Sequence, residues 1–537
     1  MLALLAALPV TAGQAVAGKA KPPETRRNNV KEVLHGVEIT DPYRWLEDQQ
    51  SPETRAWIGE QNKYTDSLLD PLPGRDRIEQ RLIELMKIDS VGVPRERNGR
   101  YFFAKRLAEQ DLSVIYMRKG ITGEDEVLID PHPMSADYTT SVTLIGASSD
   151  GQTLIYGVRE GGEDEITVHL MDVDTRQDWA DTLPKARYFA FNGGVALTPD
   201  KRGLYYARLN PEGPRVYYHA IGTDPAQDRK IFGDGYGPGK LILSRLSEDG
   251  RYLLIHVLHG SAAAKTEIYY QDLKAQGPLT PIVNDIPARF FGQIGGDQLF
   301  MQTNWQAPNN RILAVDLKNP GREHWRELVP EDEQAVIEGL SLAGGKLFVE
   351  YLRNVRSLIK VFDAEGRPVR TITFPALGSV SGLSGHWESP EAFFAFSSFH
   401  LPTTIYRYDA ASGKQTVWAR LPVQVESDTM ALRQVWYESK DGTLVPMFLL
   451  HRKGIALDGS NPTLLTGYGG FTISLTPRFS STAVLWVERG GVVAMPNLRG
   501  GGEFGEEWHR AGMRGNKQNV FDDFIAAAGW LVENGYT

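Results

Sequence analysis

The chain has 537 residues, of which 41% are hydrophobic and 23% are charged, a globular balance that excludes a disordered, collagen-like or coiled-coil protein. Its net charge of −9 argues against a nucleic acid partner, because binding to a phosphate backbone needs a basic surface. The lack of cysteine excludes disulfides, thiol nucleophiles and zinc-thiolate sites. The 54 glycines, 31 prolines and numerous aromatic residues indicate many short strands and turns.

The chain begins with an apolar run at residues 2–10, followed by an Ala-Val-Ala sequence at 15–17 that resembles a cleavage site. Residues 1–17 are therefore interpreted as a signal peptide, which predicts a periplasmic or secreted protein. No Lys or Arg precedes the apolar run, so a cytoplasmic protein is the alternative. The run is too short to span a bilayer, and no membrane association is expected.

Two helices are predicted next, at residues 52–69 and 76–88, from the helical spacing of their apolar residues. The Asp-Pro-Tyr-Arg-Trp-Leu stretch at 41–46 is interpreted as a loop that leads into the first helix.

From residue 98 onward, a turn followed by an apolar and aromatic strand occurs seven times. A second strand follows each turn by 13 to 18 residues, and the intervals between successive turns are 46 to 52 residues. The turns are marked by Gly99, Gly151, Lys201, Gly250, Asp297, Gly345 and Glu391. A β-propeller of four-stranded blades produces such a period, because one blade must stack on its neighbours to bury its faces. The repeats thus predict seven blades, and a β-sandwich array, the other architecture considered, has no reason to keep so even a period.

After about residue 430 the pattern changes to longer strands and helices. Strands are expected at 432–437, 444–450, 463–465, 483–487 and 492–496, and a helix at 519–534. In this helix Asp522 and Asp523 suit the first turn, one apolar stripe includes Phe521 and Ile525, and Gly535 can cap the end. The strand and helix form half of a βαβ unit, and a chain that stopped at Thr537 would leave the 492–495 strand at an exposed sheet edge.

Several motifs in the sequence do not support the chemistry that they suggest. Residues 500–505 match G-x-G-x-x-G, but Glu503 would lie where a dinucleotide phosphate must bind. His256 and His259 are three apart on a predicted strand and point to opposite faces, so no metal site is expected. His509 is interpreted as structural. No cofactor is predicted, and no G-x-S-x-G nucleophile motif is present.

Three segments resemble a known family. They are residues 437–447 with the Gly-Tyr-Gly-Gly-Phe sequence at 467–471, residues 497–509, and residues 517–524, and residues 41–47 match the N-terminal segment of the same family. The chain is similar over nearly its whole length to the prolyl oligopeptidases. The resemblance implies a seven-bladed β-propeller inserted into an α/β-hydrolase domain, here with the latter incomplete.

The resemblance assigns a role to two residues of this chain. Tyr468 matches the tyrosine whose hydroxyl donates to the oxyanion, and a neutral phenol can stabilise a developing negative charge. Phe471 matches an aromatic that lines the pocket for the substrate proline. The family's nucleophilic Ser, its Asp and its His would lie beyond Thr537, so residues 1–537 alone are expected to be inactive.

These observations give one interpretation of the whole chain. Residues 18–88 and 429–537 are expected to form pieces of the α/β-hydrolase domain, and residues 89–428 the propeller. The predicted function is a serine peptidase that cleaves short peptides after proline and acts as a monomer. An oligopeptidase B, which cleaves after Arg or Lys, and a non-catalytic propeller that binds peptides are the alternatives.

Overall fold

The computed structural model describes residues 21–187, 194–260 and 264–537, and the expected signal peptide lies outside the described residues. The chain divides into two compact units, residues 1–81 and 82–537. In the first unit, β1 (Val30–Leu34) and β2 (Val37–Asp41) form an antiparallel hairpin. A 3₁₀ turn, η1 (Arg44–Glu47), and helix α1 (Pro52–Leu69) follow, and the Ser51 side chain caps α1 by accepting from the Thr54 N–H. Helix α2 (Arg75–Met86) crosses the boundary between the units.

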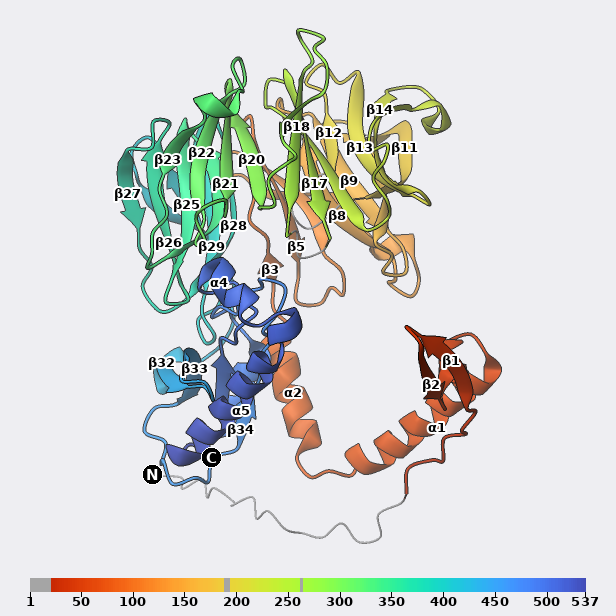
Figure 1. The fold of residues 1–537 in the computed structure, drawn as a ribbon, viewed down its shortest axis with the longest axis vertical. Coiled ribbons are helices and arrows are strands. Elements are labelled where there is room, and N and C mark those ends of the chain that lie inside the picture. The colour runs from red at the N-terminus through yellow and green to blue at the C-terminus, as the bar shows by residue number, and fades with distance from the viewer. Residues whose placement is uncertain (1–20, 188–193, 261–263) are drawn as a thin grey trace. The chain divides into compact units, whose positions relative to one another are not determined.

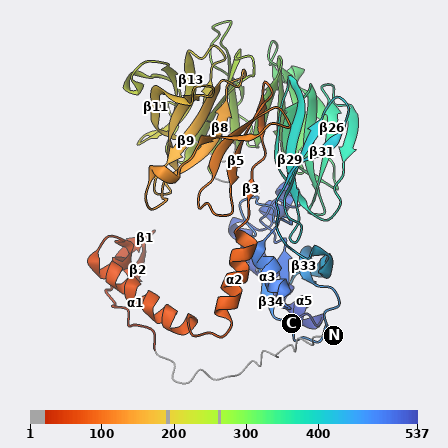
Figure 2. The same ribbon diagram turned by 180° about the vertical axis from the view of Figure 1, so that it is seen from behind.

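The larger unit begins with seven consecutive sets of antiparallel strands, which confirms the predicted propeller (Figures 1 and 2). Blades 1 to 3 contain β3 (Ser90–Val91), β4 (Arg95–Arg97), β5 (Arg100–Arg106), β6 (Val114–Lys119) and β7 (Asp125–Ile129); β8 (Ser141–Ala147), β9 (Thr153–Arg159), β10 (Glu165–Asp172) and β11 (Gln177–Arg187); and β12 (Val195–Leu197), β13 (Gly203–Asn210), β14 (Gly213–Ala220) and β15 (Arg229–Phe232). A single pairing between β11 and β13 joins blades 2 and 3 into one sheet.

Blades 4 to 7 are separate four-stranded sheets, each in sequence order. They contain β16 (Lys240–Leu246), β17 (Tyr252–His259), β18 (Thr266–Asp272) and β19 (Thr280–Val283); β20 (Phe290–Gly295), β21 (Gln298–Thr303), β22 (Arg311–Asp316) and β23 (Arg326–Val329); β24 (Val336–Ala343), β25 (Lys346–Arg353), β26 (Arg356–Asp363) and β27 (Pro368–Ile372); and β28 (Ser379–His386), β29 (Ser389–Ser397), β30 (Thr404–Asp409) and β31 (Gln415–Arg420). Short 3₁₀ turns lie at His132–Met134, Pro225–Gln227, Arg322–His324 and Ser427–Thr429.

The repeated turns have a packing role that explains their glycines. Gly151 and Gly250 both have positive φ, and a Cβ at Gly250 would lie 2.4 Å from Cδ of Pro199 in the preceding blade. A Cβ at Gly151 would lie 2.7 Å from the carbonyl oxygen of Arg97, also in the preceding blade. Each of these two turns therefore needs glycine both for its backbone conformation and for the close approach of its neighbour.

Side-chain contacts join blade 1 to blade 7. The Tyr101 hydroxyl donates to Glu391 at 2.9 Å, and Ser384 Oγ donates to the Pro94 carbonyl oxygen at 3.0 Å. The Trp418 ring packs edge-on against Phe103. Buried hydrophobic and polar contacts thus hold the two ends of the propeller together.

The last part of the chain contains a four-stranded sheet with helices on both faces. Its strand order is β32 (Met430–Glu438), β33 (Leu444–Arg452), β35 (Val492–Pro496) and β34 (Thr463–Leu465), and β34 and β35 are parallel. Alternate residues of β33 face opposite sides. Phe448 and Leu450 pack with α3 (Ser481–Glu488), whereas Met447 and Leu449 pack with α5 (Gln518–Glu533). This arrangement buries both faces of the sheet, as an α/β fold requires.

Two strand predictions in this region were wrong. Residues 483–487 lie in helix α3, whose N-terminus is capped by the Ser480 hydroxyl accepting from the Ala483 N–H. A short run that is apolar on every side has no period that separates a buried helix from a buried strand. Strand β35 lies between β33 and β34, so it is not an edge strand, and the edges of the sheet are β32 and β34.

The prediction for helix α5 was correct in position but wrong for its faces. Asn534 ends the helix, and Gly535 follows with φ of 71°. Phe521 and Ile525 are exposed, whereas Asp523, expected to interact with the helix dipole, is completely buried. The apolar stripe therefore includes a second face that does not pack on the sheet. Helix α4 (Gly505–Arg510) and the 3₁₀ turn η6 (Arg514–Asn516) were not predicted.

Candidate active site

Two loops come together at the carboxyl ends of the neighbouring parallel strands β34 and β35. One loop contains residues 466–480 and the other residues 497–504. The Thr472 N–H donates to the Gly500 carbonyl oxygen at 3.3 Å and so links the two loops. In α/β sheets ligands bind outside the carboxyl ends of the strands, so these loops form the candidate active site.

Tyr468 and Phe471 both lie on the first loop with their side chains open to solvent. Their exposed fractions are 49% and 56%. Among the residues that the structure describes, the Tyr468 hydroxyl has no hydrogen-bond partner, and its ring lies 3.8 Å from the Cβ position of Gly470. A large aromatic side chain with a free hydroxyl is available to an incoming group, as an oxyanion donor must be.

The backbone of this loop is strained at two neighbouring residues. Phe471 and Thr472 have φ of 53° and 57°, in the left-handed region that non-glycine residues seldom adopt. The Ile473 N–H donates to the Gly470 carbonyl oxygen at 3.0 Å and closes the turn. Such strain persists only where surrounding contacts hold the loop, and it is common at functional sites.

Close backbone contacts hold the strained loop from behind. A Cβ at Gly500 would lie 2.7 Å from the Gly469 carbonyl oxygen, and a Cβ at Gly502 would lie 2.5 Å from that of Thr472. Lys517 Nζ donates to the Gly469 carbonyl oxygen at 2.7 Å. Gly500 and Gly502 thus permit the two loops to touch.

Arg499 anchors the second loop through a buried ion-pair network. Its Nη2 donates to Asp523 Oδ1 at 2.6 Å, and its backbone N–H donates to Asp523 Oδ2 at 3.0 Å. Nη1 donates to Asp441 at 2.5 Å, at the turn between β32 and β33. Although burial opposes the charge, these two carboxylates raise the pKa of Arg499 above its ordinary value. Arg499 therefore ties the loop to α5 and to the sheet.

Glu503 is a buried carboxyl group behind the same loop. Its Oε1 accepts from the Leu475 N–H at 2.9 Å and from Asn497 Nδ2 at 3.3 Å, while Oε2 has no partner among the described residues. Burial raises the pKa of Glu503 to about 7, although these hydrogen bonds act in the opposite direction.

The loops also contact the propeller. Ser474 Oγ donates to Glu338 at the start of β24 at 3.2 Å, and Arg289, just before β20, pairs with Glu506 of α4 at 3.0 Å. The Glu506 N–H donates to the Pro308 carbonyl oxygen at 2.9 Å. Figure 1 shows α4 close to the lower ends of the blade strands. The candidate site therefore faces the end of the propeller at which these first strands begin.

His509 is buried, and its Nδ1 lies 2.7 Å from the Gly500 carbonyl oxygen, so it supports the loop backbone. Over residues 21–187, 194–260 and 264–537, no group of three or more His, Asp or Glu side chains could hold a metal ion. Within the same residues, the helices are all too short or too polar to cross a membrane.

Comparison with known proteins gives the family. A model described as the prolyl oligopeptidase N-terminal beta-propeller domain matches residues 22–420, and one described as the prolyl oligopeptidase family matches residues 477–537. The chain belongs to the prolyl oligopeptidase family. This agrees with the resemblance seen in residues 437–471 and 497–524.

Individual relatives are similar over most of their length. The chain is 33% identical to a prolyl endopeptidase of Elizabethkingia meningoseptica and 34% identical to one of Elizabethkingia miricola, in each case over 96% of this chain and 74% of the relative. It is also similar to a solved structure from a study of two prolyl endopeptidases, with a TM-score of 0.91 and 37% identity, over 96% of this chain and 77% of the other. These relatives are named as prolyl endopeptidases.

Sequence reasoning predicted roles for Tyr468 and Phe471 but missed the residues that hold their loops. Arg499 appeared only as a member of a matching segment, Glu503 also as an obstacle to phosphate binding, and Asp523 was assigned to the helix dipole. The available signal was the presence of charged residues in otherwise apolar or glycine-rich stretches, because charges are seldom buried there without partners.

Proposed function

We propose that this chain supplies the propeller and the first active-site loops of a serine peptidase that hydrolyses short peptides on the carboxyl side of proline. In this proposal residues 89–428 form the propeller, which keeps folded proteins from the site, and residues 18–88 and 429–537 belong to the peptidase domain. Support for the last point comes from Leu85, which packs in the core formed by α3, and from Ser481 Oγ, which donates to the Leu85 carbonyl oxygen at 3.2 Å.

The observation that carries the proposal is the hydroxyl of Tyr468, which is exposed and has no hydrogen-bond partner among the described residues, on a loop at the carboxyl end of β34. In acyl transfer the attacked carbonyl oxygen becomes negatively charged, and a donor aimed at that oxygen stabilises the transition state more than the substrate. Tyr468 would act as such a donor, with a backbone N–H next to the nucleophile as its partner. Phe471 would form one wall of the proline pocket.

The nucleophilic Ser, the Asp and the His are proposed to come from sequence downstream of Thr537, because no G-x-S-x-G motif occurs in residues 1–537. Reading the coding sequence downstream of Thr537 tests this directly. Residues 1–537 alone should not release a chromogenic group from Gly-Pro-type amides, whereas the chain with its downstream residues should. Release from an arginine amide instead would assign the oligopeptidase B specificity.

Replacing Tyr468 by Phe in the active enzyme tests its role. The ring and its packing remain, so peptide binding should hardly change, while kcat should fall on the order of 10²-fold to 10³-fold, or roughly 3 to 4 kcal/mol. Tyr138→Phe is the matched control, since Tyr138 is similarly exposed at 47% but lies in the connection between blades 1 and 2. A normal kcat in a well-folded Tyr468→Phe enzyme would remove Tyr468 from the site.

A further inference from the structure

A large cavity lies at the opposite end of the propeller from the candidate active site. Its volume is about 1020 Å³, and its lining includes the carboxyl-terminal ends of the first strands β4, β8, β12, β16 and β28. The other ends of the first strands of blades 5 and 6 contact the peptidase loops through Arg289 and Glu338. At about 3.3 Å per residue, a strand of six to eight residues separates the two places by roughly 20 Å. The cavity is therefore distinct from the Tyr468 site.

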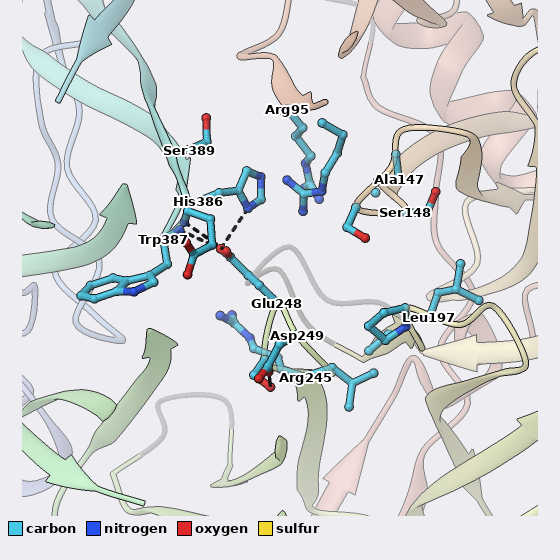
Figure 3. A pocket seen from close by; sticks show the side chains of 18 of the residues that line it. Arg95, Ala147, Ser148, Leu197, Arg245, Glu248, Asp249, His386, Trp387 and Ser389 are labelled. Atoms are coloured by element: carbon cyan, nitrogen blue, oxygen red, sulfur yellow. Dashed lines mark hydrogen bonds and ion pairs between the residues drawn. The ribbon is translucent and has the colours of Figure 1, made fainter. Parts of the chain in front are cut away.

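The acidic side chains that line this cavity are mostly engaged by other groups. Glu248 of blade 4 reaches to blade 7, where it accepts from the Trp387 N–H at 2.8 Å and lies 3.2 Å from His386 Nδ1 (Figure 3). Glu96 accepts from the Gly99 N–H at 2.8 Å. Asp249 accepts from Ser247 Oγ at 2.6 Å and from the Arg251 N–H at 3.1 Å. Glu388 is exposed at the rim.

Arg97, in contrast, has no ion pair within the described part of the chain. Its Nη1 donates to the neighbouring Glu96 carbonyl oxygen at 2.9 Å, and a guanidinium has five N–H donors in total. Burial lowers the pKa of Arg97 to about 10, and the positive charge of Arg95 adds to this, although the negative charge of Glu248 acts in the opposite direction. Arg97 therefore remains cationic at neutral pH. A partly buried cation with one hydrogen bond to the described residues requires an anion or water to satisfy its other donors.

We propose that this cavity binds the free carboxylate of a peptide through the Arg97 guanidinium. The planar guanidinium suits the two oxygens of a carboxylate, which it can bind with two parallel hydrogen bonds. A cavity of about 1020 Å³ is far larger than a small inorganic ion needs, and Leu197, Ile294 and Trp387 add apolar surface for a peptide chain. The proposal rests on the proposed function only in taking peptides as the ligands of this chain.

Figure 3 shows charged groups that surround Arg97 in the cavity lining. Arg95 points into the cavity from the side opposite Glu248, with Ser148 beside it, while Glu248 turns towards His386 and Trp387. The Arg95 guanidinium donates to the Ile145 carbonyl oxygen and places a second positive charge near Arg97. The Glu248 carboxylate also acts on Arg97, but it is engaged by the Trp387 N–H and lies against His386, so an anion between blades 1 and 4 would meet two guanidinium groups.

Peptide binding to residues 1–537 tests the site without any need for catalysis. The probes are fluorescein-labelled hexapeptides of Gly and Ala with a free C-terminal carboxylate, with a C-terminal amide, or with an amide and one Asp side chain, and binding is followed by fluorescence anisotropy. A charge-assisted pair predicts that a carboxylate peptide binds about 10-fold more tightly than the uncharged amide. The Asp-containing amide shows whether a side-chain carboxylate serves as well as a terminal one.

Variants then locate the effect. Arg97→Gln should abolish the preference for a carboxylate, and Arg97→Lys should keep part of it. Arg420→Gln, at an exposed arginine of β31 outside the cavity, should keep all of it. Tyr468→Phe should also keep the preference, so a failed peptidase proposal would not be mistaken for a failed cavity proposal.

Equal binding of the carboxylate and amide peptides to the unmodified protein would overturn the proposal, and this result needs no variant that has to fold. Carboxylate preference that survives Arg97→Gln would also overturn it. Inorganic phosphate serves as a competitor. Displacement of the carboxylate peptide by phosphate supports a shared anion site, whereas phosphate binding with no carboxylate preference among the peptides would count against a peptide site.

Discussion

The buried ion-pair network of Arg499 allows two carboxylates on one arginine to be compared. Asp523 is completely buried and accepts from the Arg499 backbone N–H, from its side chain and from Ser439 Oγ. Asp441 binds the other side of the guanidinium, but its side chain is 47% exposed. Replacing either aspartate by Asn removes one negative charge that faces Arg499 and hardly changes the side-chain volume.

The expected costs differ because of burial. Breaking a buried ion pair by removing one partner costs about 3–5 kcal/mol, since the remaining charge has no water to replace its partner. Asp523→Asn should therefore destabilise the peptidase part by about that amount. Asp441→Asn should cost less than about 1 kcal/mol, because solvent screens an exposed pair.

The pH dependence of the Asp441 pair can also be given a sign. The hydrogen bond from Arg499 lowers the pKa of Asp441 to about 2 in the folded chain, below its ordinary 3.8. The carboxylate therefore contributes stability above pH 4, and this contribution is lost as the pH falls towards 2. Asp441→Asn should accordingly match the unchanged chain in stability only below about pH 2, where this carboxyl is protonated in both the folded and the unfolded chain.

Hydrogen exchange measured by mass spectrometry reports how each substitution changes local opening of the loops and α5. Urea unfolding followed by tryptophan fluorescence reports how it changes the free energy of unfolding. In Asp523→Asn, amides of residues 497–502 and of α5 should exchange much faster, while the propeller strands should not change. The reasoning would be refuted if Asp523→Asn cost no more than Asp441→Asn, or if the loop amides kept their protection.

Two further predictions concern the same loops. The pKa of Glu503, raised by burial from 4.5 to about 7, means that the unchanged chain loses stability as the pH rises from 4.5 to 7, by about 3 kcal/mol, while Glu503→Gln does not. Thermal unfolding between pH 4.5 and 8 should show this difference, with the exposed Glu507→Gln as control, and parallel curves would contradict it. In the active enzyme, Phe471→Ala should reduce the preference for proline over alanine before the cleaved bond by about 10-fold, measured as the ratio of kcat/KM values. Phe521→Ala, at an equally exposed phenylalanine of α5, should leave this ratio unchanged, and the same ratio in both variants would remove Phe471 from the pocket.

The sequence predicted the propeller well because its turns repeat a local requirement. Gly151 and Gly250 need a positive φ and a close approach to the preceding blade, and such needs leave a visible mark in the sequence. Helix α5 was likewise predicted to within one residue at each end, since a 3.6-residue period and a C-terminal glycine are local signals. Local chemistry thus accounts for the correct part of the prediction.

The incorrect part depends on contacts that are distant in sequence. Whether residues 483–487 form a helix or a strand depends on what covers their apolar surface, and the central place of β35 depends on pairing with β33 and β34. In the same way, Glu248 reaches blade 7 across 138 positions of the sequence, and nothing near Glu248 indicates that partner. A period or a motif describes one segment at a time and cannot specify such partners.

The candidate active site combines unfavourable local features with strong support from behind. Phe471 and Thr472 each cost about 1–2 kcal/mol in the left-handed region, and Glu503 Oε2 and Asn497 Oδ1 are buried without partners among the described residues. These costs lie within a few residues of the exposed Tyr468 ring. The Arg499 network and the Lys517 bond to Gly469 hold the same loops and can offset them. Because a chain selected for stability alone has no reason to keep such a loop, the strain itself argues that the position of Tyr468 and Phe471 is what these contacts maintain.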